Sequence, residues 1–323
     1  MSTVIRPVAL QPAEGRWLSW FGNPLRYVAT AEDTGGTYCL SWGQTTPGDS
    51  PPFHRHSFEE GFYVLRGEYE FRCGNQSVHL RQGDFINIRG GASHSLKCIG
   101  NEAGELLVIA APAGFDRFQM EIGKPANGPD GPFEPQDRAL LGSMNEFAAG
   151  FGIDLAPPAS ARDESRNATI RRAGEGLVID AGGDRYRFLV EADETSGKYA
   201  LWHATVPTGG GPPPHIHSRE EEGFYIIDGE VTFYSDDLAV RLTAGSYVQV
   251  KKHSLHWFRN ESEQTAHMLV LVAPGGMEQM FRATGSLVRD PVTTIGQMTD
   301  EQKSALLRLA PEFGIQIIPP KGH

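Results

Sequence analysis

Six of the eleven histidines in this 323-residue chain fall into two matching sets, and a glutamate accompanies each set. The sets are His54, His56, Glu60 and His94 in the first half, and His215, His217, Glu222 and His256 in the second. Residues i and i+2 of a strand point to the same face, so each His-x-His pair projects two imidazoles into one space. Three imidazoles and one carboxylate suit a mononuclear divalent transition metal with positions open for water, dioxygen or substrate.

The two sets belong to a longer internal repeat. The segment EGFYVLRG that begins at Glu60 returns as EGFYIIDG at Glu222, and His94 returns as His256, in both cases 162 residues later. This shift is half the chain length and indicates a duplicated domain. We predict one domain over residues 1–160 and a second over residues 161–323, with the boundary in the polar stretch from Ala159 to Ala168.

The elements that must position these side chains are short strands. The 38 glycines and 22 prolines indicate many turns, and closely spaced apolar runs favour an all-β sandwich or barrel. Gly67 and Gly229 each lie between two such runs, which predicts a β-hairpin in each half. Short helices are expected near the end of each half, at residues 142–149 and 299–309. The expected strands are 62–64, 69–71, 77–80, 85–88 and 106–109, with partners 224–227, 231–234, 239–242, 247–250 and 268–271.

Composition excludes several classes of function. With 29 basic and 40 acidic residues the net charge is −11, which argues against non-specific binding to nucleic acid or to anionic lipid. No apolar run of membrane-spanning length and no signal peptide is evident. The three cysteines lack CxxC spacing, so we expect reduced thiols in a cytoplasmic protein with no membrane partner.

The motifs around the histidines resemble those of the cupin family. The first motif of that family is matched by Gly48, His54, His56, Glu60 and Gly67, and again by Gly209, His215, His217, Glu222 and Gly229. The second is matched by Gly83, Gly91 and His94, and by Gly245, His256 and Asn260. Arg89, Cys98, Lys251 and His253 replace the residues expected there, which brings the turn before the last histidine into question. The resemblance implies two tandem jelly-roll-like β-barrels, each with one divalent metal bound by three histidines and one glutamate.

Within this family, a chain with two complete ligand sets resembles the bicupin quercetin 2,3-dioxygenases. The resemblance implies a metal-dependent dioxygenase that opens a ring of a flavonol or a related aromatic enol or phenol. The metal would be iron in the first place, with nickel, manganese, cobalt or copper as alternatives. Glu60 and Glu222 would act as general bases as well as ligands. Aromatic residues near the ligands are candidate walls for a flat substrate: Phe53, Phe62, Phe85, Trp202, Phe224, Tyr247 and Phe258.

Several alternatives stay open at this point. A cyclase, isomerase or decarboxylase of aromatic or polyketide metabolism would use the same site without consuming oxygen, and a non-enzymatic bicupin would only bind a ligand. Glu221 fits the shorter spacing and is the alternative ligand to Glu222, and His253 is an alternative extra ligand. The sequence is compatible with a monomer or a homodimer.

Overall fold

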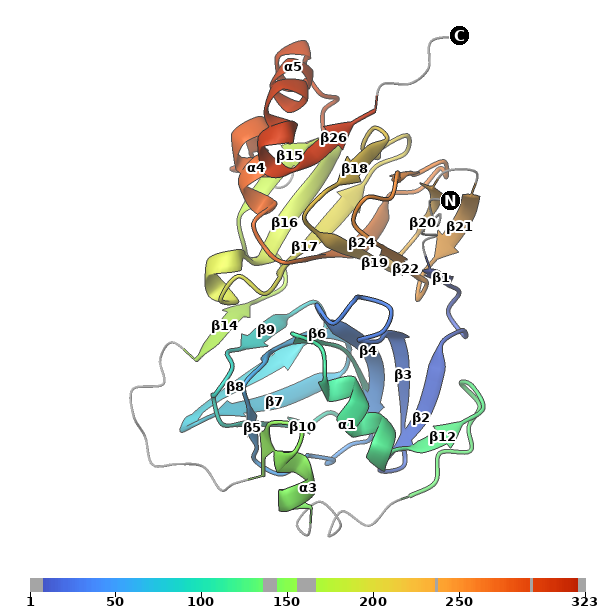
Figure 1. Cartoon of the computed structure of the whole chain (residues 1–323), viewed down its shortest axis with the longest axis vertical. Helices are drawn as coiled ribbons and strands as arrows, with labels where there is room; N and C mark the ends of the chain where they lie inside the picture. Colours follow the sequence, from blue (N-terminus) through green and yellow to red (C-terminus); the bar gives the residue numbers. More distant parts are fainter. Residues whose placement is uncertain (1–7, 136–143, 156–166, 236–237, 291–292, 319–323) are drawn as a thin grey trace. The chain divides into compact units, whose positions relative to one another are not determined.

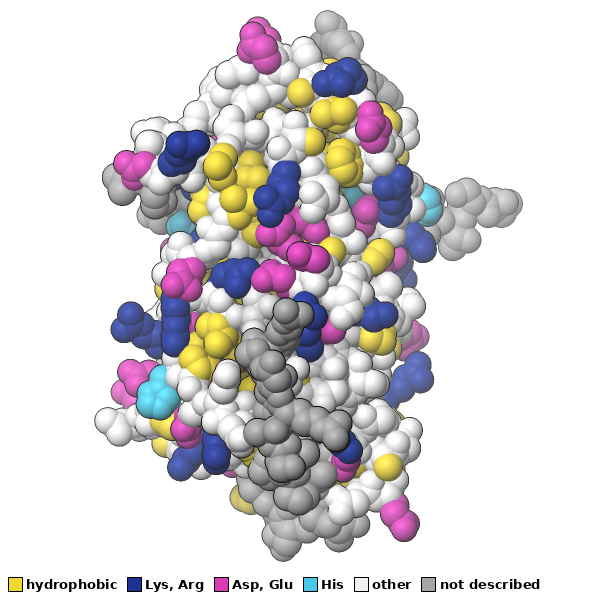
Figure 2. Space-filling view, turned by 90° about the vertical axis from the view of Figure 1, so that its left-hand side faces the viewer, with side chains coloured by type: hydrophobic (Ala, Val, Ile, Leu, Met, Phe, Trp, Pro, Cys, Tyr) yellow, Lys and Arg dark blue, Asp and Glu magenta, His cyan; other side chains and the backbone are white. Residues whose placement is uncertain are grey.

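The computed structural model describes residues 8–135, 144–155, 167–235, 238–290 and 293–318 (Figure 1). It contains two compact units, which we call the first barrel (Ala13–Gly174) and the second barrel (Met1–Pro12 with Glu175–His323). The expected boundary between residues 160 and 161 lies outside the described residues, as does most of the expected linker. None of the described helices is long and apolar enough to cross a membrane. Acidic and basic side chains are interspersed on the face in Figure 2. The cytoplasmic location stays a prediction.

The first barrel packs a large antiparallel sheet against a small one. The large sheet has the order β12-β2-β3-β4-β11-β6-β9-β14, the small sheet has the order β10-β7-β8, and β5 pairs with β13. Phe62 of the large sheet meets Phe71 of the small sheet edge-on, with ring centroids 5.0 Å apart, inside the apolar core. The elements are β2 (Arg16–Trp20), β3 (Asn23–Ala29), β4 (Cys39–Thr45), β5 (Arg55–His56), β6 (Glu59–Arg66), β7 (Glu68–Cys73), β8 (Gln76–Arg81), β9 (Phe85–Ile88), β10 (His94–Cys98), β11 (Gly104–Ala111), α1 (Phe115–Ile122), β12 (Lys124–Ala126), α3 (Asn145–Ala149), β13 (Ile153–Asp154) and β14 (Ala168–Arg171).

The second barrel repeats this plan. Its large sheet has the order β1-β22-β19-β24-β17-β16-β15-β25, its small sheet has the order β21-β20-β23, and β18 pairs with β26. Phe224 and Phe233 meet across the core, with ring centroids 5.7 Å apart. The elements are β1 (Val8–Leu10), β15 (Val178–Ala181), β16 (Asp184–Val190), η1 (Ala192–Glu194), β17 (Ala200–Val206), β18 (His215–His217), β19 (Glu221–Asp228), β20 (Glu230–Ser235), β21 (Leu238–Thr243), β22 (Tyr247–Val250), β23 (Trp257–Arg259), β24 (Ala266–Ala273), α4 (Glu278–Thr284), β25 (Ser286–Leu287), α5 (Asp300–Leu309), η2 (Ala310–Phe313) and β26 (Ile315–Ile317).

In each barrel, one terminal strand of the large sheet comes from the other half of the sequence repeat. Strand β1 comes before the first barrel in the chain but pairs with β22 of the second barrel, with Val8 opposite Gln249. Strand β14 begins the second half of the repeat but pairs with β9 of the first barrel, with Thr169 opposite Asn87. Both strands lie at the end of an eight-stranded sheet, so each covers backbone groups that an edge strand would leave unpaired.

The all-β prediction is confirmed, but the two expected hairpins are wrong. Strand β6 pairs with β9 and β11, whereas β7 pairs with β8 and β10, so the turn at Gly67 leads from one sheet to the other. Gly67 has φ +86°, and a Cβ there would lie 2.7 Å from the Cα of Gly104. Gly229 makes the same corner in the second barrel, with φ +73°. The glycines therefore serve close backbone approach at a corner, and not a two-residue hairpin.

The expected helix at the chain's end is present. Helix α5 begins after Thr299, whose side chain accepts the Gln302 backbone N–H, as in a capping box. Its shorter counterpart is α3, although residues 142 and 143 lie outside the described residues. Helices α1 and α4, which follow the last long strand of each barrel, were not predicted.

A buried residue at the start of β16 braces the loop that leads to the second His-x-His pair. Asp184 is fully buried, lies 3.2 Å from the Tyr186 Oη and accepts the Gly211 backbone N–H. Burial raises the pKa of Asp184 to about 8. At the matching first position of β3, Asn23 accepts the Thr46 backbone N–H and donates to Asp49, in the loop before His54.

Replacing Asp184 by the asparagine of the first barrel should flatten the dependence of stability on pH. The native pKa of about 8 lies above the ordinary value of 3.8, so between these values the folded state binds more protons than the unfolded state. The contribution of Asp184 to stability therefore falls as the pH rises through this window. Asp184→Asn has no such loss, and its melting temperature should fall less than that of the wild type between about pH 5 and about pH 8. Asp130→Asn, at an exposed position, is the control. An equal fall of the melting temperature with pH in the wild type and in Asp184→Asn would contradict the assignment.

Candidate metal centres

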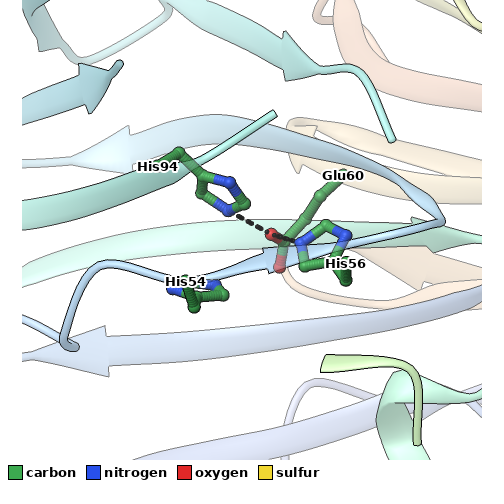
Figure 3. A group of neighbouring side chains, drawn as sticks. All are labelled: His54, His56, Glu60 and His94. Atoms are coloured by element: carbon green, nitrogen blue, oxygen red, sulfur yellow. Dashed lines mark hydrogen bonds and ion pairs between the residues drawn. The ribbon is translucent and has the colours of Figure 1, made fainter. Parts of the chain in front are cut away.

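The first barrel brings His54, His56, Glu60 and His94 together at one point (Figure 3). One ligand atom from each of these residues lies within 4.8 Å of all the others. The backbone fixes two of them directly, because His54 and His94 form an isolated antiparallel bridge with N–H···O distances of 3.0 and 2.8 Å. His56 lies on β5, and Glu60 projects from β6.

The imidazole rings are held in one tautomer. In the first barrel, Nδ1 of His54, His56 and His94 lies 2.9–3.0 Å from the backbone oxygen of Pro52, Phe58 and Ala92, respectively. In the second barrel, His215 and His256 face the backbone oxygens of Pro213 and Ser254 in the same way, at 2.8 and 3.0 Å. A carbonyl oxygen only accepts, so each of these five Nδ1 atoms carries the proton. In a neutral ring Nε2 then presents a lone pair to the centre.

These lone pairs converge on a carboxylate, which fits a cation. Nε2 of His56 and of His94 lie 2.9 and 3.0 Å from the same oxygen, Oε2 of Glu60. Burial and the charge of His94 lower the pKa of His54 to about 3, so this ring is neutral. Burial would raise the pKa of Glu60, but His56 and His94 outweigh it and hold that pKa well below its usual range. Acceptors this close repel one another unless a proton or a metal ion lies between them, and the donor set is one that divalent transition metals accept.

The second barrel forms an equivalent cluster from His215, His217, Glu222 and His256. His215 and His256 form the matching backbone bridge, and Oε2 of Glu222 lies 2.8 Å from Nε2 of His256 and 3.2 Å from Nε2 of His217. Burial lowers the pKa of His215 well below its ordinary value. The histidine charges, His217 first, outweigh burial and lower the pKa of Glu222 to about 2.

His217 differs from the other five histidines. Its Nδ1 faces a carboxylate, Oε2 of Glu220, at 3.4 Å, where the others face a backbone carbonyl. Burial would lower the pKa of His217, but Glu222 and Glu220 together raise it. The sequence analysis assigned no role to Glu220. The longer spacing between His217 and Glu222 was the signal that this side of the second cluster is built differently.

The neighbouring glutamates point away from both clusters. Glu59 accepts a hydrogen bond from Asn87 at 3.0 Å, and Glu221 accepts one from Gln249 at 3.3 Å. Adjacent residues of a strand face opposite sides, so only one glutamate of each pair can reach the centre. The structure therefore places Glu222, and not Glu221, beside the three histidines.

The turn before the last histidine keeps its form despite the unusual sequence. Gly91 has φ +90° and donates its N–H to the backbone oxygen of His56 at 2.6 Å. His253 adopts φ +70° at the matching position and donates to the backbone oxygen of His217, also at 2.6 Å. The His253 side chain is exposed and lies outside the second cluster.

A cavity opens from the first cluster into the barrel. Its volume is about 150 Å³, and His54 and Glu60 lie in its wall. Most of the wall is apolar and much of it is aromatic, and none of its described lining residues is Lys or Arg. The aromatic lining residues are Trp20, Phe21, Phe62, Phe115 and Phe118.

The cavity at the second cluster is about half as large, at about 70 Å³, and it adjoins an open groove of about 540 Å³ with which it shares lining residues. The paired strands carry different side chains at one matching position. Ser41 lies opposite Val108 in the first barrel, and Trp202 lies opposite Val270 at the matching position of the second. Trp202 is fully buried and meets Phe281 edge-on at 5.3 Å, so its indole fills space that Ser41 leaves open. The sequence repeat pairs Ser41 with Trp202, and that comparison could have indicated the asymmetry.

The structure brings only some of the predicted aromatic residues near a centre. Phe62 lines the first cavity. Phe224 belongs to the second core, with its ring centroid 6.3 Å from that of His256, and Trp202 is packed in the same core. Phe258 lies in this core and at an open groove of the second barrel.

The remaining predicted aromatic residues lie elsewhere. Phe85 pairs with Tyr63, whereas Phe62 pairs with Ile86, so strand alternation turns Phe85 to the opposite face of the sheet. Tyr247 is its repeat partner, and its hydroxyl donates to Gln249. Phe53 is half-buried below the Arg72 guanidinium, 5.7 Å from the ring centroid.

The histidines without a repeat partner lie outside both clusters. His79 is exposed, and His203 and His267 neighbour each other with ring centroids 5.2 Å apart. Burial lowers the pKa of His203 to about 3. His323 lies outside the described residues.

Comparison with known proteins agrees with this architecture. The family described as cupin domain matches residues 43–110 and 202–272, one region in each barrel. Quercetin 2,3-dioxygenase of Bacillus subtilis is 27% identical over 293 residues, which is 86% of each chain. Among solved structures, oxalate decarboxylase of Lactobacillus farciminis is similar with a TM-score of 0.57 and 13% identity, over 85% of this chain and 88% of that one.

A variant of Bacillus subtilis oxalate decarboxylase is similar with a TM-score of 0.60 and 16% identity, over 85% of this chain and 79% of the other. At these identities, the likeness to the decarboxylases concerns the fold alone. The matched regions contain both ligand sets in full, one region in each barrel. The chain is therefore a bicupin, with two cupin domains in tandem.

Proposed function

We propose that this bicupin is a metal-dependent dioxygenase that opens a ring of a flavonol or a related aromatic enol or phenol. The observation that carries the proposal is the first cavity, whose apolar and aromatic walls end at His54 and Glu60. A flat aromatic substrate fits such walls, and its hydroxyl would face the ligands. The similarity to a quercetin 2,3-dioxygenase over most of the chain supports the same chemistry.

The ligands of the first centre would hold one divalent metal through Nε2 of three histidines and the carboxylate of Glu60. When bound, such a metal lowers the pKa of a coordinated hydroxyl and supplies the redox chemistry that dioxygen requires. Iron comes first, with nickel, manganese, cobalt and copper as alternatives. Mn(II) centres occur in Bacillus subtilis oxalate decarboxylase, a protein of similar fold.

In this proposal Glu60 acts as general base. It is ionised, lies in the cavity wall and would accept the proton of the substrate hydroxyl at Oε1 or Oε2. The aromatic side chains around it, Phe62 among them, exclude water and would align the substrate ring. The same role for Glu222 stays a prediction, because the second cavity has half the space.

The lining of the first cavity favours an aromatic substrate over a small dianion. Oxalate would require a cationic partner to offset its second carboxylate, and the described lining residues include neither Lys nor Arg. A non-oxidative reaction on an aromatic enol would use the same walls, and the oxygen measurement below separates these two chemistries.

Each cluster should bind one metal ion independently. His54→Ala removes a ligand from the first cluster only, and His215→Ala removes one from the second only. We expect two metal ions per wild-type chain and one in each variant, measured by elemental analysis after reconstitution and gel filtration. His79→Ala, at an exposed position outside both clusters, should still bind two. Two tightly bound ions in His54→Ala would contradict the assignment.

Oxygen uptake tests the reaction itself. The protein is reconstituted in parallel with Fe(II), Ni(II), Mn(II), Co(II) and Cu(II), and oxygen and flavonol absorbance are followed with quercetin. We expect metal-dependent uptake, and Glu60→Gln should lower turnover by about 100-fold or more at equal metal content, because the base is lost. Glu59→Gln, whose carboxylate faces Asn87, is the control and should retain turnover. Normal turnover in metal-loaded Glu60→Gln would exclude the base role, and no uptake with any metal would exclude the dioxygenase.

Filling the first cavity should abolish substrate binding without affecting the metal. Ser41→Trp introduces the residue that the second barrel carries at the matching position. We expect loss of flavonol binding, measured by quenching of intrinsic fluorescence, with metal content unchanged. Ser41→Ala, which adds no volume, should bind normally. Unimpaired binding by Ser41→Trp would show that the substrate lies elsewhere.

A further inference from the structure

The two centres differ in the number of buried carboxylates that face the ligands. The first centre has Glu60 alone, because Glu59 is turned toward Asn87. The second has Glu222 and, behind His217, Glu220. Glu220 is only 5% exposed, and His217 is the one positively polarised group that the described contacts place at its Oε2.

The difference arises from one additional residue in the loop between the second histidine and the glutamate. In the first barrel, three residues separate His56 from Glu60. There the Phe58 ring stacks on the His56 ring with centroids 3.6 Å apart. The backbone oxygen of Phe58 accepts a hydrogen bond from the Nδ1–H of His56 at 2.9 Å. In the second barrel, four residues separate His217 from Glu222. The Glu220 carboxylate lies on the Nδ1 side of His217, at an ion-pair distance of 3.4 Å that is longer than the 2.9 Å hydrogen bond of the first barrel.

We propose that Glu220 is a positioning residue that makes the second centre the tighter of the two metal sites. A carboxylate at Nδ1 fixes the ring and makes the opposite nitrogen a stronger donor than a backbone carbonyl does. The charges act in the same direction. The second centre has one more buried carboxylate beside it than the first, so a divalent ion there meets one more negative charge. In a buried environment that difference favours retention of the ion at the second centre.

The proposal has a consequence for how the chain uses its two metals. The second centre fills first and releases its ion last, next to the smaller cavity that His215 and His217 line. The first centre, with one carboxylate fewer, lies beside the larger of the two cavities that ligand histidines line. The inference rests on metal binding by the two clusters and not on the proposed oxidation, so its test uses no substrate.

The test measures metal retention at one centre at a time. His215→Ala leaves only the first centre and His54→Ala only the second. Both are loaded with Mn(II), dialysed against increasing EDTA, and analysed for bound manganese. We expect the second centre to retain Mn(II) at a chelator concentration about 10-fold or more higher. In the His54→Ala background, Glu220→Gln should weaken binding by about 10- to 100-fold, the range for loss of such a partner.

Glu221→Gln is the matched control, because it also removes a buried negative charge beside Glu222 but faces Gln249. It should change retention by about 2-fold at most, and Glu220→Asp should restore part of the loss. With Co(II) as the ion, the visible ligand-field bands should shift in Glu220→Gln and not in Glu221→Gln. Equal losses in both glutamine variants would overturn the proposal, because net charge alone would then explain them. Unchanged Mn(II) retention in Glu220→Gln would also overturn it. So would tighter retention in His215→Ala than in His54→Ala, a comparison that does not depend on the folding of the glutamate variants.

Discussion

The contact between an imidazole Nδ1 and a backbone carbonyl is the constraint on which both centres depend. It is made at five of the six ligand histidines. At three of them, His56, His94 and His256, Nε2 lies 2.8–3.0 Å from a buried glutamate. A cluster of acceptors is unfavourable on its own, so the fold must force them together. The backbone bridges between His54 and His94 and between His215 and His256 do this, because they join two ligands through the main chain and not through flexible side chains.

Because the main chain holds the ligands, the surrounding side chains are free to diverge. His253 takes the left-handed conformation that Gly91 takes in the first barrel, and the hydrogen bond to the histidine before it is retained. Ser41 and Trp202 occupy matching positions on β4 and β17, but Ser41 lines the first cavity whereas Trp202 is packed in the second core. Duplication has thus preserved the centre and varied its access.

The sequence predicted the parts of the site that local spacing determines. His-x-His on one strand, and a glutamate in register with Phe62 or Phe224, identify six histidines and two glutamates that the structure brings together. Corner and hairpin turns share the same glycine signal, so Gly67 was misassigned until the partners of β6 were known. The exchange of β1 and β14 depends on pairing between residues more than 75 apart, which no local pattern encodes. Strand alternation correctly placed Phe62 on the same face of the sheet as Glu60. Phe85 lies opposite Tyr63 and therefore points to the other face.

The asymmetry of charge and that of volume point to a division of labour between the barrels. A metal ion that is to polarise a substrate must keep positive charge and space beside it, and a site with a single carboxylate next to an open cavity provides both. A second carboxylate at Nδ1, as at His217, strengthens binding but neutralises the ion. One centre cannot be optimised for both. Two copies in one chain remove that conflict, since one can be selected for reactivity while the other is selected for retention of its ion.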